Sequence, residues 1–458
     1  MINPKNQVRK TIDLAEYGEI TIPAADLSFL SEQKFQTVCE TLSSLVNISF
    51  GWGGGHLSIK AGSNVGVIQT HGLRVQVRPA LSVKEMVVLI RYALSGKVPL
   101  QHLRSFADVD WGTGFEDVLC MMLCEESREI LRIGLSCRYE ERREPLTFLR
   151  GRPLWEKNFP WRGGKTRELT CRYHRLTYDN IDNRLLLVGL RSAGHLATSE
   201  AVKRKVFQFV KTIGDLASET TPEPGQFDQA EQRYNRLTEH YRAAHGLCRM
   251  LIYSLRPESL YESGKHQIFG IVLDMAWLFE KFIEQLMAET LKPAGFNIES
   301  QAPDRKALLD AEGYPYVSVR PDLIISQSRT VCGVIDAKYK RYWPTATNSF
   351  APMRKIANED IYQLFFYQQR LQRKFNLPTP PVAVIAAPLP EEDERGDQAV
   401  IAERFKRVVW QAGAEKAGDV RLILIPMTKF LRLIIQREKP GDIVEKIGLN
   451  RIRDLFRD

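Results

Sequence analysis

The chain has 458 residues, of which 44% are hydrophobic and 26% charged, with seven cysteines and a formal net charge of +9. These values predict a soluble globular protein of about two to four domains, and the excess of positive charge suits a polyanion such as DNA. No run approaches the ~20 apolar residues of a membrane span, and residues 1–5 lack the apolar core of a secretory signal. The cysteines are scattered without a CxxC pair, so neither a zinc site nor a disulfide framework is indicated, and we expect a cytoplasmic protein.

Residues 1–110 are predicted to form a strand-rich N-terminal α/β module with a twisted sheet. Alternating apolar and polar residues between Gly-containing turns favour strands, which we place at 11–23 (with a break at a glycine), 56–60, 65–70 and 73–77. Helices are expected at 31–45 and 82–94. Ser82 is a plausible N-cap for the second helix.

Residues 111–265 are predicted to form a mixed and then mainly helical middle region. The expected helices lie at 115–133, 184–195, 201–218 and 229–255. Residues 219–225, rich in proline and glycine, are expected to be a short link.

Three features of this first half allow alternative interpretations. Gly51–Gly55 could bind phosphate, but no helix start follows it, so a flexible turn that displays Trp52 is favoured. Arg138–Pro153 could touch phosphate, although its alternating charges favour a solvated strand and turn. His174 has no nucleophile or metal ligands near it in the sequence, which favours an ordinary strand residue.

The most informative stretch is a predicted hairpin in the second half. Residues 317–326 and 331–339 are rich in Val and Ile, and the polar tetrad 327–330 between them is typical of a turn. Asp336 and Lys338, two residues apart on one strand, point to the same side, and Asp322 on the neighbouring strand can point towards them.

Two carboxylates and an ammonium at the end of an apolar sheet are costly as architecture alone. The carboxylates suit a hard cation such as Mg²⁺, and Lys338 can orient a water or stabilise charge on a phosphate. The alternative is a surface hairpin with an ordinary Asp/Lys pair, because D-x-K alone is a weak signal.

Two helices are expected to flank this hairpin. On the first, 268–291, Glu280 lies at the edge of the apolar face and needs a partner, which a metal shared with Asp322 and Asp336 would supply. The second begins near residue 358 and places Asp360, Gln363 and Tyr367 on one face, where Gln363 could hold the attacking water or the scissile phosphate. Apolar runs at 381–387 and 420–426 suit buried strands, and 441–456 is expected to be a basic amphipathic helix.

The order of these parts resembles a restriction-endonuclease-like core, a mixed sheet flanked by helices, and the motif Pro321-Asp322…Asp336-x-Lys338 resembles the PD-(D/E)XK nuclease signature. More specifically, the chain resembles the McrC family, the nuclease subunit of McrBC-type modification-dependent restriction systems. The phrases that carry this resemblance are Trp277–Phe282, Pro321–Ile324, Asp336–Tyr339 and Asp360–Gln363, with further matches at Arg143–Leu146, Leu149–Arg152 and Asp179–Asn183.

The resemblance implies a Mg²⁺-dependent DNA endonuclease, with Mn²⁺ as a possible substitute. Its expected metal ligands are Asp322, Asp336 and Glu280, and its expected catalytic residues are these three with Lys338 and Gln363. It also implies that the chain binds and stimulates a McrB-like hexameric AAA+ GTPase, so that GTP acts through the partner, and that the substrate is double-stranded DNA.

The expected organisation is multidomain, of the α+β or α/β class. The module 1–110 and the middle region 111–265 together form the expected partner-binding half, and 266–458 is the expected endonuclease domain. Two other functions stay open from the sequence: a non-catalytic activator of the GTPase, and a stand-alone PD-(D/E)XK nuclease of DNA repair or transposition.

Overall fold

The chain is a mixed α/β protein that divides into two compact units, Met1–Gly112 with Val272–Asp458, and Thr113–Ile271. The computed structural model describes residues 8–43, 45–50, 55–96, 114–158, 168–218, 225–253, 269–301, 304–309, 314–340, 356–389, 400–406 and 419–457, with isolated positions between them. The N-terminal module and the C-terminal part of the chain therefore belong to the same unit. Within the described residues, every helix is too short or too polar to cross a bilayer.

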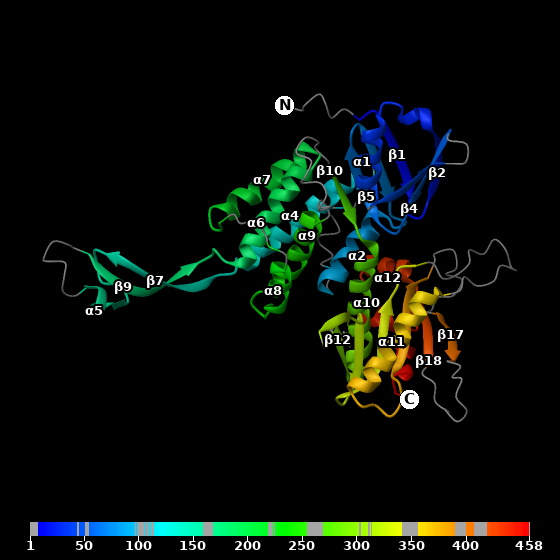
Figure 1. Ribbon diagram of the computed structural model, residues 1–458. Coiled ribbons are helices and arrows are strands. Elements are labelled where there is room, and N and C mark those ends of the chain that lie inside the picture. The colour runs from blue at the N-terminus through cyan, green and yellow to red at the C-terminus, as the bar shows by residue number, and fades with distance from the viewer. Residues whose placement is uncertain are drawn as a thin grey trace. The chain divides into compact units, whose positions relative to one another are not determined.

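The N-terminal module is built mainly of strands, as its alternating pattern predicts (Figure 1). Its elements are β1 (Lys10–Ala15), β2 (Glu19–Pro23), η2 (Ala24–Leu27), α1 (Glu32–Leu42), β3 (Val46–Phe50), β4 (His56–Ala61), β5 (Val65–Thr70), β6 (Leu73–Arg78) and α2 (Val83–Ser95). β1 pairs in parallel with β6, and β5 pairs antiparallel with β6, while β2, β4 and β3 form a second sheet. Ser82 caps α2 through a capping box with Glu85, which confirms the expected N-cap. Trp52 lies outside the described residues.

A six-stranded mixed sheet forms the centre of the C-terminal part, in the order β11-β14-β15-β16-β18-β17. Its strands are β11 (Phe296–Ser300), β14 (Leu323–Gln327), β15 (Thr330–Ala337), β16 (Val382–Pro388), β17 (Val400–Lys406) and β18 (Asp419–Ile425). The central strands β15, β16 and β18 run parallel, and the outer pairs are antiparallel. β12 (Asp304–Leu309) and β13 (Pro315–Val319) form a separate two-stranded sheet.

Helices bury the apolar surface of this sheet. They are α10 (Met275–Leu291), η7 (Lys292–Ala294), α11 (Asn358–Lys374), α12 (Met427–Ile435), α13 (Pro440–Lys446), η9 (Leu449–Arg451) and α14 (Ile452–Leu455). α11 covers the sheet face that carries Ile324, Val334 and Ile385, and contributes Leu364 and Leu371 to the shared core. α10 packs against β11 and β15.

The helix α2 joins the N-terminal module to the helices of the central sheet. It packs against α10 and α12 (Figure 1). Tyr92 of α2, Phe282 of α10 and Phe430 of α12 form a cluster of mutual ring contacts. Beside this cluster Arg432 Nε lies 2.7 Å from Glu85 Oε1. These contacts explain why the module and the sheet form one compact unit.

Several predicted boundaries are wrong, each for a local reason. The expected helix at 268–291 begins only at Met275, because Asp274 is its N-cap and β10 (Phe269–Leu273) precedes it, at the edge of the β1-β6-β5 sheet. The expected strand at 317–326 is interrupted at 320–322, where Pro321 lacks the N–H that a ladder needs. The expected C-terminal helix is broken around Gly448, which has a positive φ.

The second unit is a helical bundle that carries a long antiparallel ribbon of two strands, β7 and β9, with a short third strand, β8, paired to β9. Its elements are α4 (Phe115–Ile133), β7 (Arg138–Leu146), β8 (Arg152–Pro153), α5 (Trp155–Asn158), β9 (Leu169–Thr177), α6 (Ile181–Leu196), α7 (Glu200–Gly214), α8 (Gln226–Gln232), η5 (Glu239–Tyr241) and α9 (Arg242–Tyr253). The predicted helix at 229–255 is therefore three separate pieces.

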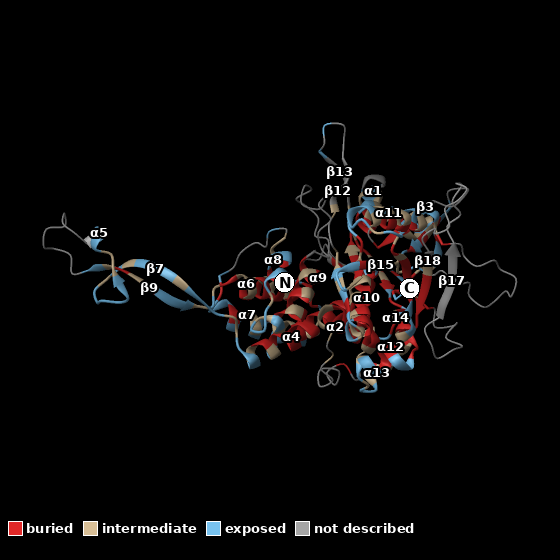
Figure 2. Cartoon of the chain, turned by 90° about the horizontal axis from the view of Figure 1, so that it is seen from below, coloured by how far each residue is buried: buried red, intermediate tan, exposed pale blue. Residues whose placement is uncertain are grey.

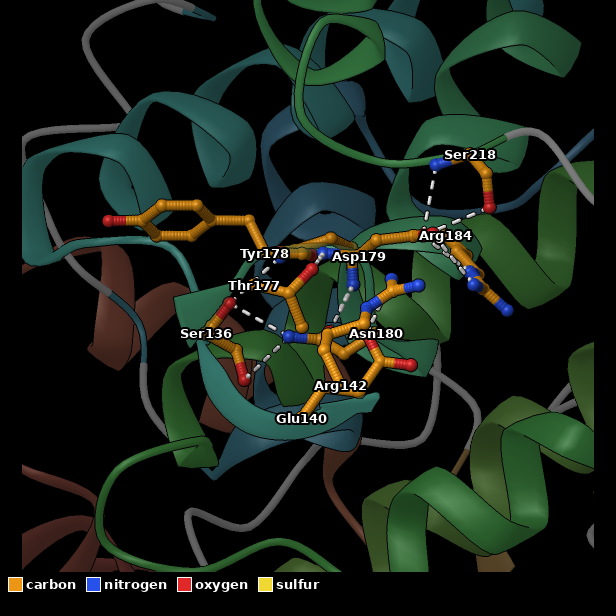
Figure 3. Close-up of polar contacts among 10 residues, drawn as sticks. Ser136, Glu140, Arg142, Thr177, Tyr178, Asp179, Asn180, Arg184 and Ser218 are labelled. Atoms are coloured by element: carbon orange, nitrogen blue, oxygen red, sulfur yellow. Dashed lines mark hydrogen bonds and ion pairs between the residues drawn. The ribbon is translucent and has the colours of Figure 1, made fainter. Parts of the chain in front are cut away.

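The β7–β9 ribbon is antiparallel along its whole length, from Arg138 opposite Thr177 to Leu146 opposite Leu169. Figure 2 shows it largely exposed or intermediate, whereas the helices of the bundle also have buried faces. The solvated strand expected within 138–153 is confirmed, and so is the placement of His174 in a strand. At the base of the ribbon, Asn180 donates to Ser136 O at 2.8 Å and Asp179 contacts Arg184 and Ser218 (Figure 3).

Candidate active site

The β14–β15 hairpin brings the two predicted aspartates opposite each other. Ser328 and Arg329, both with positive φ, form its turn, as expected from the polar tetrad. Leu323 is paired with Ile335, so the next position of the ladder sets Asp322 against Asp336. Because side chains alternate along a strand, both aspartates share the α11-covered face with Ile324 and Val334.

The backbone and side chains around these aspartates hold them together. The Ala337 N–H donates to Asp322 Oδ2 at 2.7 Å, and Asp336 is only 1% exposed. Lys338 Nζ lies 2.7 Å from Asp336 Oδ2, in an ion pair that lacks the alignment of a hydrogen bond. Lys338 and Asp336 therefore point the same way, as the two-residue spacing predicts.

α11, which covers one face of the sheet, contributes the remaining residues of the site. Lys338 Nζ donates to Gln363 Oε1 at 3.0 Å, and Gln363 Nε2 donates to the Tyr367 hydroxyl at 2.7 Å. Lys340 Nζ donates to the buried carboxylate of Asp360 at 2.8 Å. The helix face that carries Asp360, Gln363 and Tyr367, as predicted, thus lies toward Lys338 and Lys340, which follow β15.

Glu280 on α10 is the third acid of the cluster. Its Oε1 atom is buried and has no hydrogen-bond donor in the part of the chain that the structure describes. Burial raises the pKa of Glu280, and the negative charges of Glu284 and Asp336 add to that rise. A carboxylate in this position gains from a cation that approaches it.

The charges at the site shift the pKa of each central group. Burial, helped by the charges of Asp336 and Glu280, raises the pKa of Asp322 to about 8. Burial also raises the pKa of Asp336, although Lys338 opposes this rise. Burial acts to lower the pKa of Lys338, but Asp336 and the neighbouring acids outweigh it, so the pKa of Lys338 lies above its usual value. The lysine is therefore a cation at neutral pH.

The acids fit a hard divalent cation in their chemistry. Glu280 Oε1 is a buried oxygen without a hydrogen-bond donor among the described residues, and Asp336 Oδ2 is a buried oxygen that faces the Lys338 ammonium. Burial and the neighbouring acids make Asp322 hard to ionise. No three His, Cys, Asp or Glu side chains in the described ranges already form a metal-binding group. Mg²⁺ is commonly held by one or two carboxylates with waters in the remaining positions, a donor set that the two aspartates match.

The structure places Asp322, Asp336, Lys338 and Gln363 in one continuous set of contacts, with Glu280 close enough to influence both aspartates electrostatically. Their chemical roles stay predictions. Two participants were not foreseen. Lys340 could have been suspected from its two-residue spacing after Lys338, whereas Tyr17, whose hydroxyl donates to Tyr339 O, left no signal because it is 322 residues away.

Fold and site together define a mixed α/β protein whose central sheet carries a cluster of acids, with Asp336 and Asp360 buried, beside the less buried lysines Lys338 and Lys340. A family model described as "McrBC 5-methylcytosine restriction system component" matches residues 59–376, more than half of the 458 residues, and the chain belongs to this family.

Two solved structures are similar to this chain. One is a half-complex from a tetradecameric assembly of Thermococcus gammatolerans McrB AAA+ hexamers with bound McrC, with a TM-score of 0.51, 18% identity, and coverage of 94% of this chain and 100% of that chain. The other is the T. gammatolerans McrBC complex, with a TM-score of 0.43, 18% identity, and coverage of 62% of this chain and 88% of that chain. At such identity the first likeness shows the fold alone. No curated protein matches the chain.

Proposed function

We propose that this chain is the Mg²⁺-dependent DNA endonuclease subunit of a GTP-dependent, McrBC-like restriction system. The observation that carries the proposal is the convergence of Asp322, Asp336, Lys338 and Gln363 at the end of the β14–β15 hairpin. The order of strands and helices around them supports a restriction-endonuclease-like core of the PD-(D/E)XK type. Family membership supports the restriction system.

Asp322 and Asp336 would hold the metal, and Glu280 would join them directly or through a water. Mg²⁺ at such a site lowers the pKa of bound water and stabilises negative charge on a phosphate. Mn²⁺ is expected to substitute for it. GTP has no role at this site and acts through the partner.

Lys338 supplies the second positive charge of the reaction. In phosphodiester hydrolysis the water oxygen bonds to phosphorus and the water gives up one proton, while the bond from phosphorus to one sugar oxygen breaks and that leaving oxygen takes up one proton. Because the pKa of Lys338 is raised, its ammonium donates to a phosphate oxygen and stabilises the charge that develops there. Gln363 fixes the direction of the ammonium, and Tyr367 fixes Gln363.

The same chain binds and stimulates a hexameric AAA+ GTPase. The supporting comparison is the similar structure taken from an assembly of AAA+ hexamers with bound McrC. Within this chain, the exposed β7–β9 ribbon and the short helix α5 offer large aromatic side chains to a partner, since Tyr139 of β7 is 72% exposed and Trp155 of α5 is 59% exposed. The second unit is therefore the best candidate for the docking surface inside the partner-binding half expected at 1–265.

The test is cleavage of a 5-methylcytosine-containing plasmid by the chain with its cognate GTPase and GTP. Cutting should require Mg²⁺ or Mn²⁺ and stop in EDTA. Asp336→Asn should abolish cutting and leave GTP turnover unchanged. The control is Asp454→Asn, at an aspartate whose side chain is 74% exposed, and it should match the wild type in both assays. Undiminished cutting in excess EDTA contradicts the metal proposal. Wild-type cutting by Asp336→Asn contradicts the nuclease proposal.

A further inference from the structure

A tyrosine of the N-terminal module contacts the backbone immediately after the candidate catalytic lysine. The Tyr17 hydroxyl donates to the Tyr339 carbonyl oxygen at 2.8 Å, and the two rings stack with their centroids 6.5 Å apart. The Tyr339 ring in turn contacts Phe279, the residue before Glu280, at 5.6 Å. These residues belong to the same compact unit. The N-terminal module thus reaches the end of the strand that carries Asp336.

The turn between β1 and β2 holds Tyr17 in an unusual backbone conformation. Its φ is +60°, in the left-handed region that residues with a side chain rarely adopt. Hydrogen bonds fix this turn, since Tyr17 N donates to Gly62 O at 3.2 Å and Gly18 N donates to Ala15 O at 2.8 Å. A β-carbon on Gly18 would approach the Ala15 oxygen to 2.8 Å. Such a strained conformation persists only where the surrounding contacts enforce it, so the turn holds Tyr17 in a fixed position.

The segment that Tyr17 contacts is the exit of β15. Lys338 N donates to Ala386 O at 2.8 Å, which continues the pairing of β15 with β16 by one residue. Lys340 N then donates to Lys338 O at 2.8 Å, and the Lys340 side chain binds Asp360. The Tyr339 carbonyl belongs to the peptide plane that links it to Lys340. Tyr17 therefore restrains the chain where it leaves the sheet, one residue beyond Lys338.

We infer that Tyr17 is a positioning residue for DNA cleavage. Its hydroxyl holds the Lys338–Lys340 segment so that the Lys338 ammonium stays directed at Asp336 and Gln363. Cutting is thereby made dependent on the N-terminal module. This inference rests on the proposed nuclease function, and assigns to the module a part in the chemistry in addition to any part in partner binding.

The experiment compares Tyr17→Phe with Tyr92→Phe in the full chain, assembled with the partner GTPase and GTP. Both changes remove one hydroxyl, but that of Tyr92 is buried and has no hydrogen-bond partner among the described residues. Tyr17→Phe should lower kcat for cleavage about fivefold, the rate equivalent of one neutral hydrogen bond, with KM for DNA and GTP turnover unchanged. Tyr92→Phe should match the wild type.

A second measurement follows the segment itself, without reference to activity. The Lys338 and Lys340 amides, both hydrogen-bonded, should exchange with solvent about fivefold faster in Tyr17→Phe than in the wild type or Tyr92→Phe. Unchanged amide exchange in Tyr17→Phe, or faster exchange with an unchanged kcat, would overturn the positioning role of Tyr17. The proposed nuclease function would still stand in that case if the wild type cleaves DNA and Lys338→Ala does not. Absence of cleavage by the wild type would instead overturn the proposed function, and this inference with it.

Discussion

Two aspartates buried next to each other are unfavourable unless a proton or a cation lies between them. Asp322 shows this cost directly, because burial and the charges of Asp336 and Glu280 raise its pKa to about 8. Lys338 compensates only in part, since it is also held by Gln363 and has Asp360 4.0 Å away. If the proposed metal binds here, the arrangement would gain affinity for a divalent cation at the cost of stability of the metal-free protein.

The unfavourable burial of Asp322 beside Asp336 predicts the effect of Asp322→Asn on the stability of the folded chain. The pKa of Asp322 is about 8 in the folded chain against a reference value of 3.8, so the folded state keeps a proton that the unfolded state loses. The contribution of Asp322 to the free energy of unfolding is therefore largest below the reference pKa and is lost as the pH rises towards 8. In EDTA at pH 8, Asp322→Asn should therefore raise the free energy of unfolding by about 0.5–2 kcal/mol. In Mg²⁺, with the partner and GTP, the same variant should not cleave DNA.

Urea unfolding at pH 5 and pH 8 measures this difference, with Asp454→Asn as the exposed control. The gain should shrink at pH 5 and should also shrink at pH 8 when Mg²⁺ is added to the wild type. A loss of stability at pH 8 would show that the two aspartates do not repel each other in the folded chain.

Strand β15 depends on a glycine for its contact with the C-terminal residues. A β-carbon on Gly333 would come within 2.2 Å of the Phe456 ring, and Phe456 is itself buried. Gly333→Ala should therefore lower the free energy of unfolding by roughly 1–3 kcal/mol, the usual cost of overpacking a core. Phe456→Leu in the same chain should recover part of the loss, and chemical denaturation measures both. A fully additive double variant would show that the two positions do not compete for space.

The elements that could be predicted from the sequence are those with a local signal. The alternation of β4 and β6, the Ser82 cap and the polar turn at 328–329 each specify their structure within a few residues. The start of α10 could not be predicted in this way, because β10 and α10 are both apolar and only Asp274 separates them.

The site followed the same rule. Asp322, Asp336 and Lys338 could be grouped from strand spacing, and Gln363 from helix spacing, because both periods are local. Tyr17 could not be found, since its contact with Tyr339 depends on how the N-terminal module packs on the central sheet. That packing is determined by α2, α10 and α12. The apolar face of each helix does not specify which other helix it packs against.

The division of the whole molecule predicts which fragments are stable. Residues 113–271 form a compact unit with its own core, which includes Leu186, Leu190 and Cys248. This fragment should fold, bind the cognate GTPase and raise its GTP turnover without cutting DNA. The fragment 1–265 should be poorly soluble, because it lacks the α10 and α12 surfaces against which α2 packs.

Size-exclusion chromatography and phosphate release check both fragments. The full chain with Lys338→Ala is the reference for stimulation without cutting. Binding of the partner by 272–458 alone, with none by 113–271, would contradict the assignment of the docking surface to the second unit.

The β14–β15 hairpin is proposed to carry a nuclease site, and Lys338→Ala gives the sharpest test of that claim. The change removes one ammonium and leaves both aspartates in place. Plasmid cleavage should fall by about 10²–10³, the scale of deleting one electrostatic donor, while phosphate release from GTP in the same mixture stays at the wild-type rate. Lys446→Ala, at a 55% exposed lysine side chain, should change neither activity. Wild-type cleavage by Lys338→Ala would mean that Asp322, Asp336 and Lys338 form only a structural ion cluster, and would contradict the claim.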